Sequence, residues 1–461
     1  MSTLELVGAD QEVPLVDGSS TRYVNLDYAA STPPLTAVTE AIDAFLPYYS
    51  SVHRGAGFKS VVSTELYESA RDAVRRFFGA PAGHAVVFTR NTTDSLNLLA
   101  SALPEGTSVL TFASEHHANL LAWRRPGLRL RVLPIPADAE QAVTAARAAM
   151  VEGPVDLLTV TGACNVSGEL WPLDELASVS HDHGAAIAVD AAQLAPHVPI
   201  DMDALGIDYL AASAHKMYAP FGCGVLVGNH RWLASGPPFL RGGGAVRFVT
   251  TEDVLWADLP DREEAGSPNV VGAYAFAIAL QELSSYGMDR VRDHDAALGS
   301  YARRRLAAID GVSVHGLWAE DAPRTGVALF NVEGYHHSLV AAVLGAEHGI
   351  GVRHGCFCAH PLLVHLLGLN EPEIREVAAS MRDGRQRPVP GAVRASVGVG
   401  STEDDVDRLA AALEQLVRAG PRAKYALDDA TAQYVPVADG RPRPDLALPP
   451  ASVGAPGGES S

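Results

Sequence analysis

Short apolar runs alternate with amphipathic segments through the first half of the chain. The runs are rich in β-branched residues and lie at 86–89, 109–113, 130–135, 156–161, 186–189, 209–213 and 224–227. Apolar runs of this length, separated by helical patterns, are typical of parallel strands that are buried on both faces of a sheet. The pattern therefore predicts an α/β fold built on a mostly parallel, seven-stranded sheet.

Capping residues and helix breakers locate several helices. Pro172 and Gly184 bracket an amphipathic segment between two predicted strands, which indicates a βαβ crossover. Ser63 or Thr64 is the expected cap of a helix that ends near Gly79. A last amphipathic helix is expected over 403–419, where acidic residues stand at the N-terminal end.

The patterns divide the chain into four parts. Residues 1–25 form an N-terminal segment, and residues 26–285 form a large domain that carries the sheet. Longer helices and a βαβ-like passage over 312–332 predict a smaller C-terminal α/β domain at 286–422. Residues 423–461 are rich in Pro and Gly, so we expect a disordered tail that buries too little apolar surface to fold alone.

Composition and charge exclude several kinds of partner. Apolar residues make up 47% and charged residues 19%, as in ordinary globular proteins. A formal charge of −19 repels phosphate backbones and anionic lipids, which argues against nucleic-acid and membrane-surface binding. The N-terminus does not resemble a signal peptide, no apolar run suits a membrane span, and four cysteines are too few for a disulfide framework. We therefore expect a cytoplasmic protein.

Two residues at the ends of neighbouring predicted strands indicate carbonyl chemistry. Asp190 ends one strand and Lys216 follows the next, and ligands of open α/β sheets bind at this edge. A lysine forms Schiff bases with carbonyl compounds, and pyridoxal phosphate (PLP) needs such a lysine and an aspartate that pairs with its protonated ring nitrogen. Taken alone, the two residues also fit a surface lysine and a turn aspartate.

Nine short motifs follow one another between about residue 23 and about residue 416. They read LDYAAS, VHRG, TRNTTDSLNLLA, SEHHANLLAW, VDAAQ, SAHK, EAGSPN, VRHGCFCAHPL and VRASVG. Together they resemble the class V aminotransferase superfamily of fold-type I PLP enzymes, and within it the group II cysteine desulfurases and selenocysteine lyases. The resemblance implies a PLP-dependent enzyme that acts on an amino acid.

The resemblance also implies which residues bind the cofactor. Lys216 holds PLP as a Schiff base, Asp190 pairs with the ring nitrogen, and Gln193 contacts the phenolic oxygen. A helix N-terminus is a suitable phosphate site, and the implied phosphate ligands are Thr92, Thr93, Ser213 and His215. For the two threonines alone, simple helix capping is the alternative reading.

Further residues match the substrate side of the family's active site. Arg394 corresponds to the arginine that grips the substrate α-carboxylate, a task suited to a planar bidentate fork. His116 matches the histidine that stacks on the ring and assists proton transfer, and Asn165 lies near cofactor and substrate. Arg353 and His53 complete the expected substrate-binding set. Taken alone, Arg394 also suits a surface ion pair.

Two motifs imply contacts between subunits. Ser267 stands where the family commonly has a threonine that reaches the phosphate of the neighbouring subunit, and the segment with His53 also crosses to that subunit. The resemblance therefore implies a homodimer with composite active sites.

A nucleophilic thiol distinguishes a desulfurase from its relatives. Cys358 matches the catalytic cysteine of the group II enzymes, and Arg353, His354 and His360 can favour its thiolate. On an extended strand, Cys356 would point to the same face as Cys358 and serve as an accessory thiol.

The cysteine spacing does not favour a metal. A site of Cys356, Cys358 and His360 would have a tighter spacing than structural zinc sites, and no second cysteine pair occurs, so we expect no metal. Cys164 and Cys223 are expected to be small buried hydrophobic residues.

The favoured function is conversion of L-cysteine to L-alanine, with the sulfur held as a persulfide on Cys358 before a protein or small thiol accepts it. One alternative is another class V enzyme, such as a selenocysteine lyase, C–S lyase, epimerase or aminotransferase, in which Cys358 is not the nucleophile. A catalytically silent PLP-fold protein is the third. The 35 residues between Cys358 and Arg394 are more than the family usually has, and we expect a helical stretch and a polar loop there, close to the site mouth.

Overall fold

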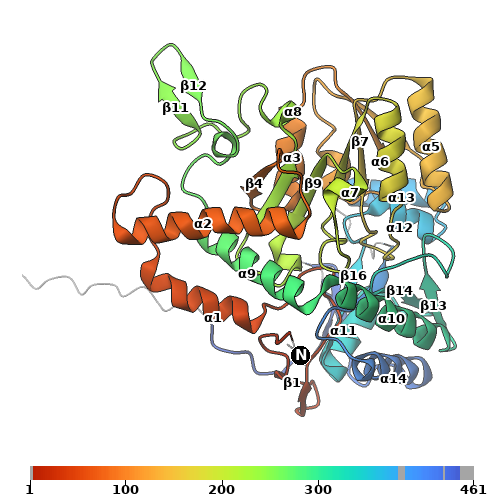
Figure 1. Ribbon diagram of the computed structural model, residues 1–461. Helices are drawn as coiled ribbons and strands as arrows, with labels where there is room; N and C mark the ends of the chain where they lie inside the picture. Colours follow the sequence, from red (N-terminus) through yellow and green to blue (C-terminus); the bar gives the residue numbers. More distant parts are fainter. Residues whose placement is uncertain (1–3, 383–389, 429–430, 447–461) are drawn as a thin grey trace, which may run out of the picture.

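The structure is a computed structural model in which residues 4–382, 390–428 and 431–446 are described. Its centre is a seven-stranded sheet in the order β4-β10-β9-β8-β7-β5-β6 (Figure 1). Strand β10 is antiparallel to both of its neighbours, and the other neighbouring strands are parallel. The predicted mostly parallel sheet is confirmed, and its strands are β4 (Ala85–Thr89), β5 (Ser108–Phe112), β6 (Arg129–Leu133), β7 (Leu157–Thr161), β8 (Ala186–Asp190), β9 (Tyr209–Ser213) and β10 (Gly224–Gly228).

Both faces of this sheet are buried, which explains why the strands read as unbroken apolar runs. Along β9, Leu210 and Ala212 belong to one hydrophobic core while Tyr209 and Ala211 belong to another. The first core is completed by α2 (Phe58–Phe77), α5 (Ala139–Glu152), α6 (Leu173–Asp182) and α9 (Val270–Tyr286), and the second by α3 (Thr92–Ala102), α4 (His117–Leu121) and α8 (His230–Leu233).

The helix boundaries confirm one sequence signal and correct another. Pro172 is the N-cap of α6, and Gly184 follows its end with a φ of +74°. Helix α2, however, begins six residues earlier than Thr64, with Gly57 as its N-cap. Ser63 and Thr64 lie inside the helix, where the Thr64 hydroxyl donates to the carbonyl oxygen of Ser60 (2.8 Å). Serine and threonine can bond to the preceding turn in this way, so the expected cap was wrong.

A second, antiparallel sheet follows the first in the chain. Its order is β13-β14-β17-β16, and the helices α10 (Met288–Ala307), α11 (His337–His348) and α14 (Glu403–Ala419) share its core. The strands are β13 (Val312–His315), β14 (Val327–Val332), β16 (Arg353–Gly355) and β17 (Ala392–Ser396). Because β13 and β14 pair antiparallel, the expected βαβ-like passage is wrong. Helix α14 has the predicted bounds and begins with a capping box between Thr402 and Asp405.

Helices and short strand pairs complete the described part of the chain. They are α1 (Thr36–Phe45), α7 (Met202–Leu205), α12 (His360–Leu366), α13 (Glu371–Arg382), β1 (Glu12–Pro14), β2 (Ser20–Arg22), β3 (Val24–Asn25), β11 (Val246–Val249), β12 (Val254–Trp256) and β15 (Ile350–Gly351). The β11–β12 hairpin projects away from the rest of the molecule (Figure 1). Within the described residues, no helix is both long enough and apolar enough to cross a membrane.

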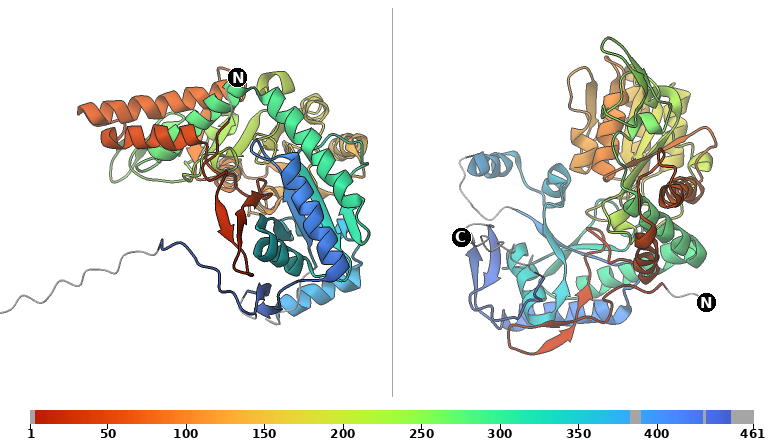
Figure 2. Two further views of the ribbon diagram at one scale, coloured as in Figure 1. Left: turned by 90° about the horizontal axis from the view of Figure 1, so that it is seen from below. Right: turned by 90° about the vertical axis from the view of Figure 1, so that its left-hand side faces the viewer.

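The sequence led us to expect a disordered tail from residue 423 onward. The structure instead contains an ordered hairpin in this segment. Strands β18 (Tyr425–Asp428) and β19 (Gln433–Pro436) form a hairpin beside α11, seen in blue in Figure 2. The buried carboxylate of Glu347 on α11 accepts hydrogen bonds from the Arg422 and Ala423 amides and from the Tyr425 hydroxyl, each 3.0 Å long. Residues 447–461 of the expected tail lie outside the described residues.

Removing the Glu347 carboxylate tests this anchor. In Glu347→Ala, three donors lose their acceptor, and we expect trypsin to cleave after Lys424 at least about tenfold faster than in the wild type. Limited proteolysis followed by mass spectrometry measures this rate. The control is Glu333→Ala, an exposed glutamate before the same helix. Equal cleavage rates in Glu347→Ala and the wild type would contradict the anchoring role.

Candidate active site

A cavity of about 300 Å³ lies at the carboxyl ends of the parallel strands, beside the second sheet. This is the edge at which open α/β sheets bind ligands. The cavity gathers most of the residues that the sequence singled out. Its walls are Ala29, Ala30, Asn91, Thr92, Thr93, His116, Ala118, Thr161, Asn165, Asp190, Ala192, Gln193, Ser213, His215, Lys216, Arg353, Phe357, Cys358 and Arg394.

Lys216 and Asp190 face the cavity from adjacent strand ends. Asp190 is the last residue of β8, and Lys216 ends the short 3₁₀ helix Ala214–Lys216 that follows β9. Burial lowers the pKa of Lys216 to about 8, although the negative charge of Asp190 opposes this shift. Burial also raises the pKa of Asp190, against an Ala192 N–H bond and the Lys216 charge. The site therefore supplies an amine that is partly unprotonated near neutral pH.

One end of the cavity is built for an anion. Asn91, rather than either threonine, caps α3 by accepting the Asp94 N–H bond (3.0 Å). The capping alternative for Thr92 and Thr93 is therefore wrong, and both line the cavity at the helix N-terminus. The Ser213 hydroxyl lies 2.7 Å from the Thr92 hydroxyl and accepts the Thr92 N–H bond at 2.8 Å.

Two histidines in the wall are held in the neutral form. Burial is the main reason that the pKa of His116 falls to about 4, and the same holds for His215. His116 is also the N-cap of α4, and its Nδ1 accepts the Ala118 N–H bond (3.1 Å). Since Nδ1 is an acceptor, the proton of the neutral His116 ring sits on Nε2. His116 thus offers one N–H donor and no charge to the cavity.

Arg394 is the central cation on the opposite side. It is only 2% exposed, so the surface ion-pair alternative is wrong. Its Nη1 donates to the Asn165 carbonyl oxygen (2.6 Å), and its Nη2 donates to Asp27 Oδ1 (3.3 Å). Asp27 also accepts a bond from Arg353 Nε (3.1 Å), and the Arg394 guanidinium lies 5.1 Å from the Phe357 ring centroid. Two arginines therefore share one carboxylate on this side of the cavity.

The Cys358 segment is a turn and not an extended strand. Strand β16 ends at Gly355, and the Ala359 N–H donates to the Cys356 carbonyl oxygen (2.9 Å). Phe357 and Cys358 both have positive φ, at +53° and +54°. The expectation that Cys356 and Cys358 share one face of a strand is wrong because the left-handed backbone breaks the alternation. Cys358 is exposed and lines the cavity, whereas Cys356 is half-buried.

The charged neighbours expected to favour a Cys358 thiolate have other partners. Arg353 bonds to Asp27, and His354 Nδ1 lies 3.2 Å from His337 Nδ1. The ring of His360 stacks on His117. The structure thus brings these residues near the turn but engages each of them elsewhere.

The two remaining cysteines do not line the cavity. Cys164 and Cys223 are buried, as expected, and burial raises the pKa of the Cys164 thiol to about 11. In the part of the chain that the structure describes, no three His, Cys, Asp or Glu side chains converge as metal ligands.

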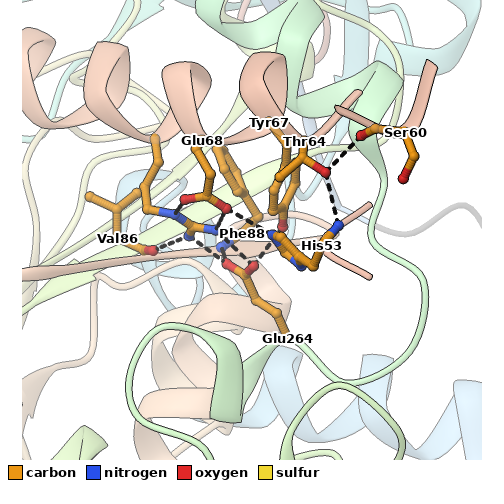
Figure 3. A network of polar contacts seen from close by, with 9 residues as sticks. His53, Ser60, Thr64, Tyr67, Glu68, Val86, Phe88 and Glu264 are labelled. Carbon is orange, nitrogen blue, oxygen red and sulfur yellow. Dashed lines mark hydrogen bonds and ion pairs between the residues drawn. The ribbon is translucent and has the colours of Figure 1, made fainter. Parts of the chain in front are cut away.

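His53 and Ser267 do not line the cavity of their own chain. His53 belongs to a polar network (Figure 3), in which His53 Nε2 is 2.9 Å from Glu68 Oε1. Ser267 follows Glu264 of this network by three residues. Glu264 accepts bonds from Arg71, from the Tyr67 hydroxyl and from the Phe88 N–H, at 2.8, 2.6 and 2.7 Å. The network ties the EAGSPN loop to β4, the strand that leads into α3.

The segment between Cys358 and Arg394 contains the expected helix. It is formed by α12 and α13, and His360 at the start of α12 contacts α4 beside the cavity. The expected polar loop falls largely on residues 383–389, which lie outside the described residues.

The family model for class V aminotransferases ("Aminotransferase class-V") matches residues 24–409, which is most of the chain. The chain therefore belongs to the class V aminotransferase family, whose fold-type I members use PLP.

Within the family, the chain is similar to cysteine desulfurases. It is 35% identical over 416 residues to a probable cysteine desulfurase of Halalkalibacterium halodurans, which covers 88% of this chain and 95% of the relative. The apo structure of a cysteine desulfurase from Thermococcus onnurineus NA1 has a TM-score of 0.77 and 30% identity, and covers 91% of this chain and all of that one. A cysteine desulfurase structure from Escherichia coli has a TM-score of 0.72 and 31% identity, with 85% and 94% covered.

The residues present fit PLP. Asp190 uses one oxygen to accept the Ala192 N–H bond, which leaves the second for a protonated ring nitrogen. Gln193 Oε1 and Arg394 Nε are buried without a hydrogen-bond partner among the described residues, so each has capacity for a bound molecule. The anion-binding end at Thr92, with its hydroxyl groups, suits a phosphate.

The sequence analysis missed two wall residues, Asn91 and Phe357, and Asp27, which bonds to the wall residues Arg353 and Arg394. Asp27 stands in the LDYAAS motif, and its signal was an acidic residue next to the end of a buried strand. Asn91 had a signal too, since Asn just before a helix is a strong N-cap candidate. Phe357 had none, because its place beneath Arg394 depends on the left-handed turn.

The reactivity of Lys216 towards aldehydes tests the electrostatics. Only the neutral amine attacks a carbonyl, so we expect the rate of Lys216 labelling by PLP in apo protein to fall as the pH drops through about 8. In Asp190→Asn the charge that raises the Lys216 pKa is gone, and the midpoint should move to lower pH. Borohydride trapping and peptide mass spectrometry measure both curves, with the exposed Asp182→Asn as control. A wild-type midpoint near the ordinary value of about 10 would contradict the assignment.

Proposed function

We propose that the protein is a PLP-dependent cysteine desulfurase that converts L-cysteine to L-alanine and holds the released sulfur on Cys358. One observation carries the proposal: an exposed cysteine shares a single cavity with a lysine of lowered pKa and a buried arginine. A transaminase or epimerase has no need of a thiol at this place. The similarity to cysteine desulfurases supports the same conclusion.

The amino-acid substrate is held by its carboxylate. Arg394 has an unpaired Nε–H in the cavity wall, and its position is fixed by Asn165 and Asp27. A guanidinium held in this way loses little freedom when it binds a carboxylate, which favours affinity. Burial lowers the pKa of Arg394 to about 10, so it remains charged near neutral pH.

The chain's own groups move the protons. PLP, when bound, supplies an electron sink that stabilises negative charge at the substrate Cα. Lys216 Nζ, with a pKa of about 8, can remove the proton from the substrate Cα and deliver a proton in a later step. Asp190 would hold the ring nitrogen of the cofactor and keep it protonated. His116 Nε2–H can donate to the substrate or cofactor without adding a charge that would repel the lysine.

Cys358 completes the reaction by taking the sulfur. Its Sγ attacks the substrate sulfur, the bond from sulfur to Cβ breaks, and Cβ is protonated. The substrate leaves as alanine, and Cys358 retains a persulfide. Because Cys358 is exposed, an acceptor protein or a small thiol in solution can reach the persulfide and take its outer sulfur.

Replacing the thiol tests the proposal. The wild type, loaded with PLP and given L-cysteine and dithiothreitol, is expected to form alanine and sulfide in equal amounts. Cys358→Ser should lower both by at least about 100-fold because a serine cannot carry a persulfide. The matched control is Cys356→Ser, which should keep most of the alanine formation. If Cys358→Ser makes alanine at the wild-type rate, sulfur transfer to Cys358 is not the mechanism.

The protein is also proposed to act as a homodimer in which His53 and Ser267 reach the partner's site. The supporting observation is a set of exposed apolar side chains on α2, on the 3₁₀ helix Leu46–Tyr48 that follows α1, and on the β11–β12 hairpin. Phe58 is 74% exposed and Phe248 is 65% exposed, with Leu255 beside it on the hairpin at 57%. Exposed apolar groups of this kind mark association surfaces.

A charged substitution on the hairpin tests the dimer. Phe248→Asp should shift the sedimentation profile from dimer towards monomer and weaken PLP retention, because burying an unpaired carboxylate is unfavourable. Val151→Asp, at the exposed end of α5, is the control for a charge placed on another surface. A wild type that sediments as a monomer at all concentrations would rule out the composite site.

A further inference from the structure

The Cys358 turn has a backbone that its residues do not favour by themselves. Phe357 and Cys358 follow one another in the left-handed region, which side-chain-bearing residues rarely adopt, so surrounding contacts must hold them there. On one side Asn165 Nδ2 donates to the Phe357 carbonyl oxygen (2.7 Å). On the other side the His117 N–H donates to the Cys358 carbonyl oxygen (2.7 Å).

His117 makes a second contact with the same segment through its side chain. Its ring stacks on that of His360, with centroids 5.0 Å apart and planes 12° apart. His117 Nε2 lies 3.2 Å from His360 Nδ1 and accepts the His360 backbone N–H bond (3.4 Å). His117 therefore binds the chain at both Cys358 and His360.

These contacts define where the protons are. Because Nε2 of His117 accepts a backbone N–H bond, it carries no proton, and the neutral ring is protonated on Nδ1. His360 Nδ1 must then donate to His117. A proton added to His117 Nε2 would remove the acceptor of the His360 backbone N–H, and that bond would be lost. The other titratable groups facing the pair are His116, whose ring is 6.3 Å away, and Cys358.

We infer that His117 and His360 form a clasp that positions Cys358 for sulfur transfer, and that acid opens this clasp. The inference rests on the proposed function for the role of Cys358, but the clasp itself is a property of the fold. His117 and His360 are positioning residues, because their contacts act on the backbone of the turn. The neighbouring His116 faces the PLP side, so one dipeptide serves both the cofactor and the thiol.

Two substitutions of His117 distinguish the packing of its ring from the hydrogen bond that its Nε2 accepts. His117→Phe keeps a flat ring but accepts no bond, whereas His117→Gln keeps an acceptor that does not titrate. Amide hydrogen exchange of the peptide 355–362, relative to intrinsic rates, should be at least about tenfold faster in His117→Phe at every pH. In the wild type it should rise at acid pH, as His117 gains a proton, and in His117→Gln this acid effect should disappear.

Sulfur transfer gives the second readout. Single-turnover alanine formation should be about tenfold slower in His117→Phe and close to normal in His117→Gln, while the spectral change on L-cysteine binding is the same in both. His360→Ala should behave like His117→Phe, and its exposed position makes it safe for folding. His365→Ala, an exposed histidine on the same helix, is the control.

The outcomes separate the two proposals. If exchange of this peptide in His117→Phe and His360→Ala equals that of the wild type, the clasp does not exist and the inference is wrong. Faster exchange with unchanged alanine formation would show that the clasp does not position Cys358, which also overturns it. If the wild type forms no alanine, the proposed function fails, and hydrogen exchange alone then decides on the clasp.

Discussion

The arrangement of the site depends on the contacts of the buried Arg394 guanidinium. Arg394 lies on β17 of the second sheet, yet it bonds to Asn165 in the loop that follows β7 of the first sheet. Asn165 in turn bonds to the turn that carries Cys358. A guanidinium buried this deeply must be compensated, and the Asn165 carbonyl, Asp27 and the face of Phe357 provide that compensation. The need to satisfy one buried cation therefore fixes the first sheet, the second sheet and the Cys358 turn relative to one another.

Burial also decides the charges around the lysine. The same loss of solvent that lowers the Lys216 pKa keeps His116 and His215 neutral, so the two histidines add no positive charge to that of Arg394 and Arg353 near the amine. Asp190 provides the opposing negative charge. Beside this pair, Arg353 and Arg394 share the single carboxylate of Asp27, so the region keeps a net positive charge that suits an anionic ligand.

Much of the fold and the site could be predicted from local sequence, and two of the failures have a common cause. Strand runs buried on both faces and the α14 capping residues act over a few positions, so their patterns were readable. The placement of Lys216 and Asp190 followed from the shared edge of parallel strands. The turn at Phe357 could not be read, because its left-handed backbone is held by a residue 192 positions away. The hairpin after residue 423 was also missed because of a distant contact, since its anchor is Glu347 on α11, 78 positions before Tyr425.

The link between Asp27 and Arg394 also has a consequence for biosynthesis. The two residues are 367 positions apart, so the carboxylate waits for its partner until nearly the whole chain has left the ribosome. A nascent chain can therefore complete its central sheet while Asp27 still lacks the Arg394 guanidinium. The contact that joins the two sheets beside the cavity forms only when translation is nearly finished.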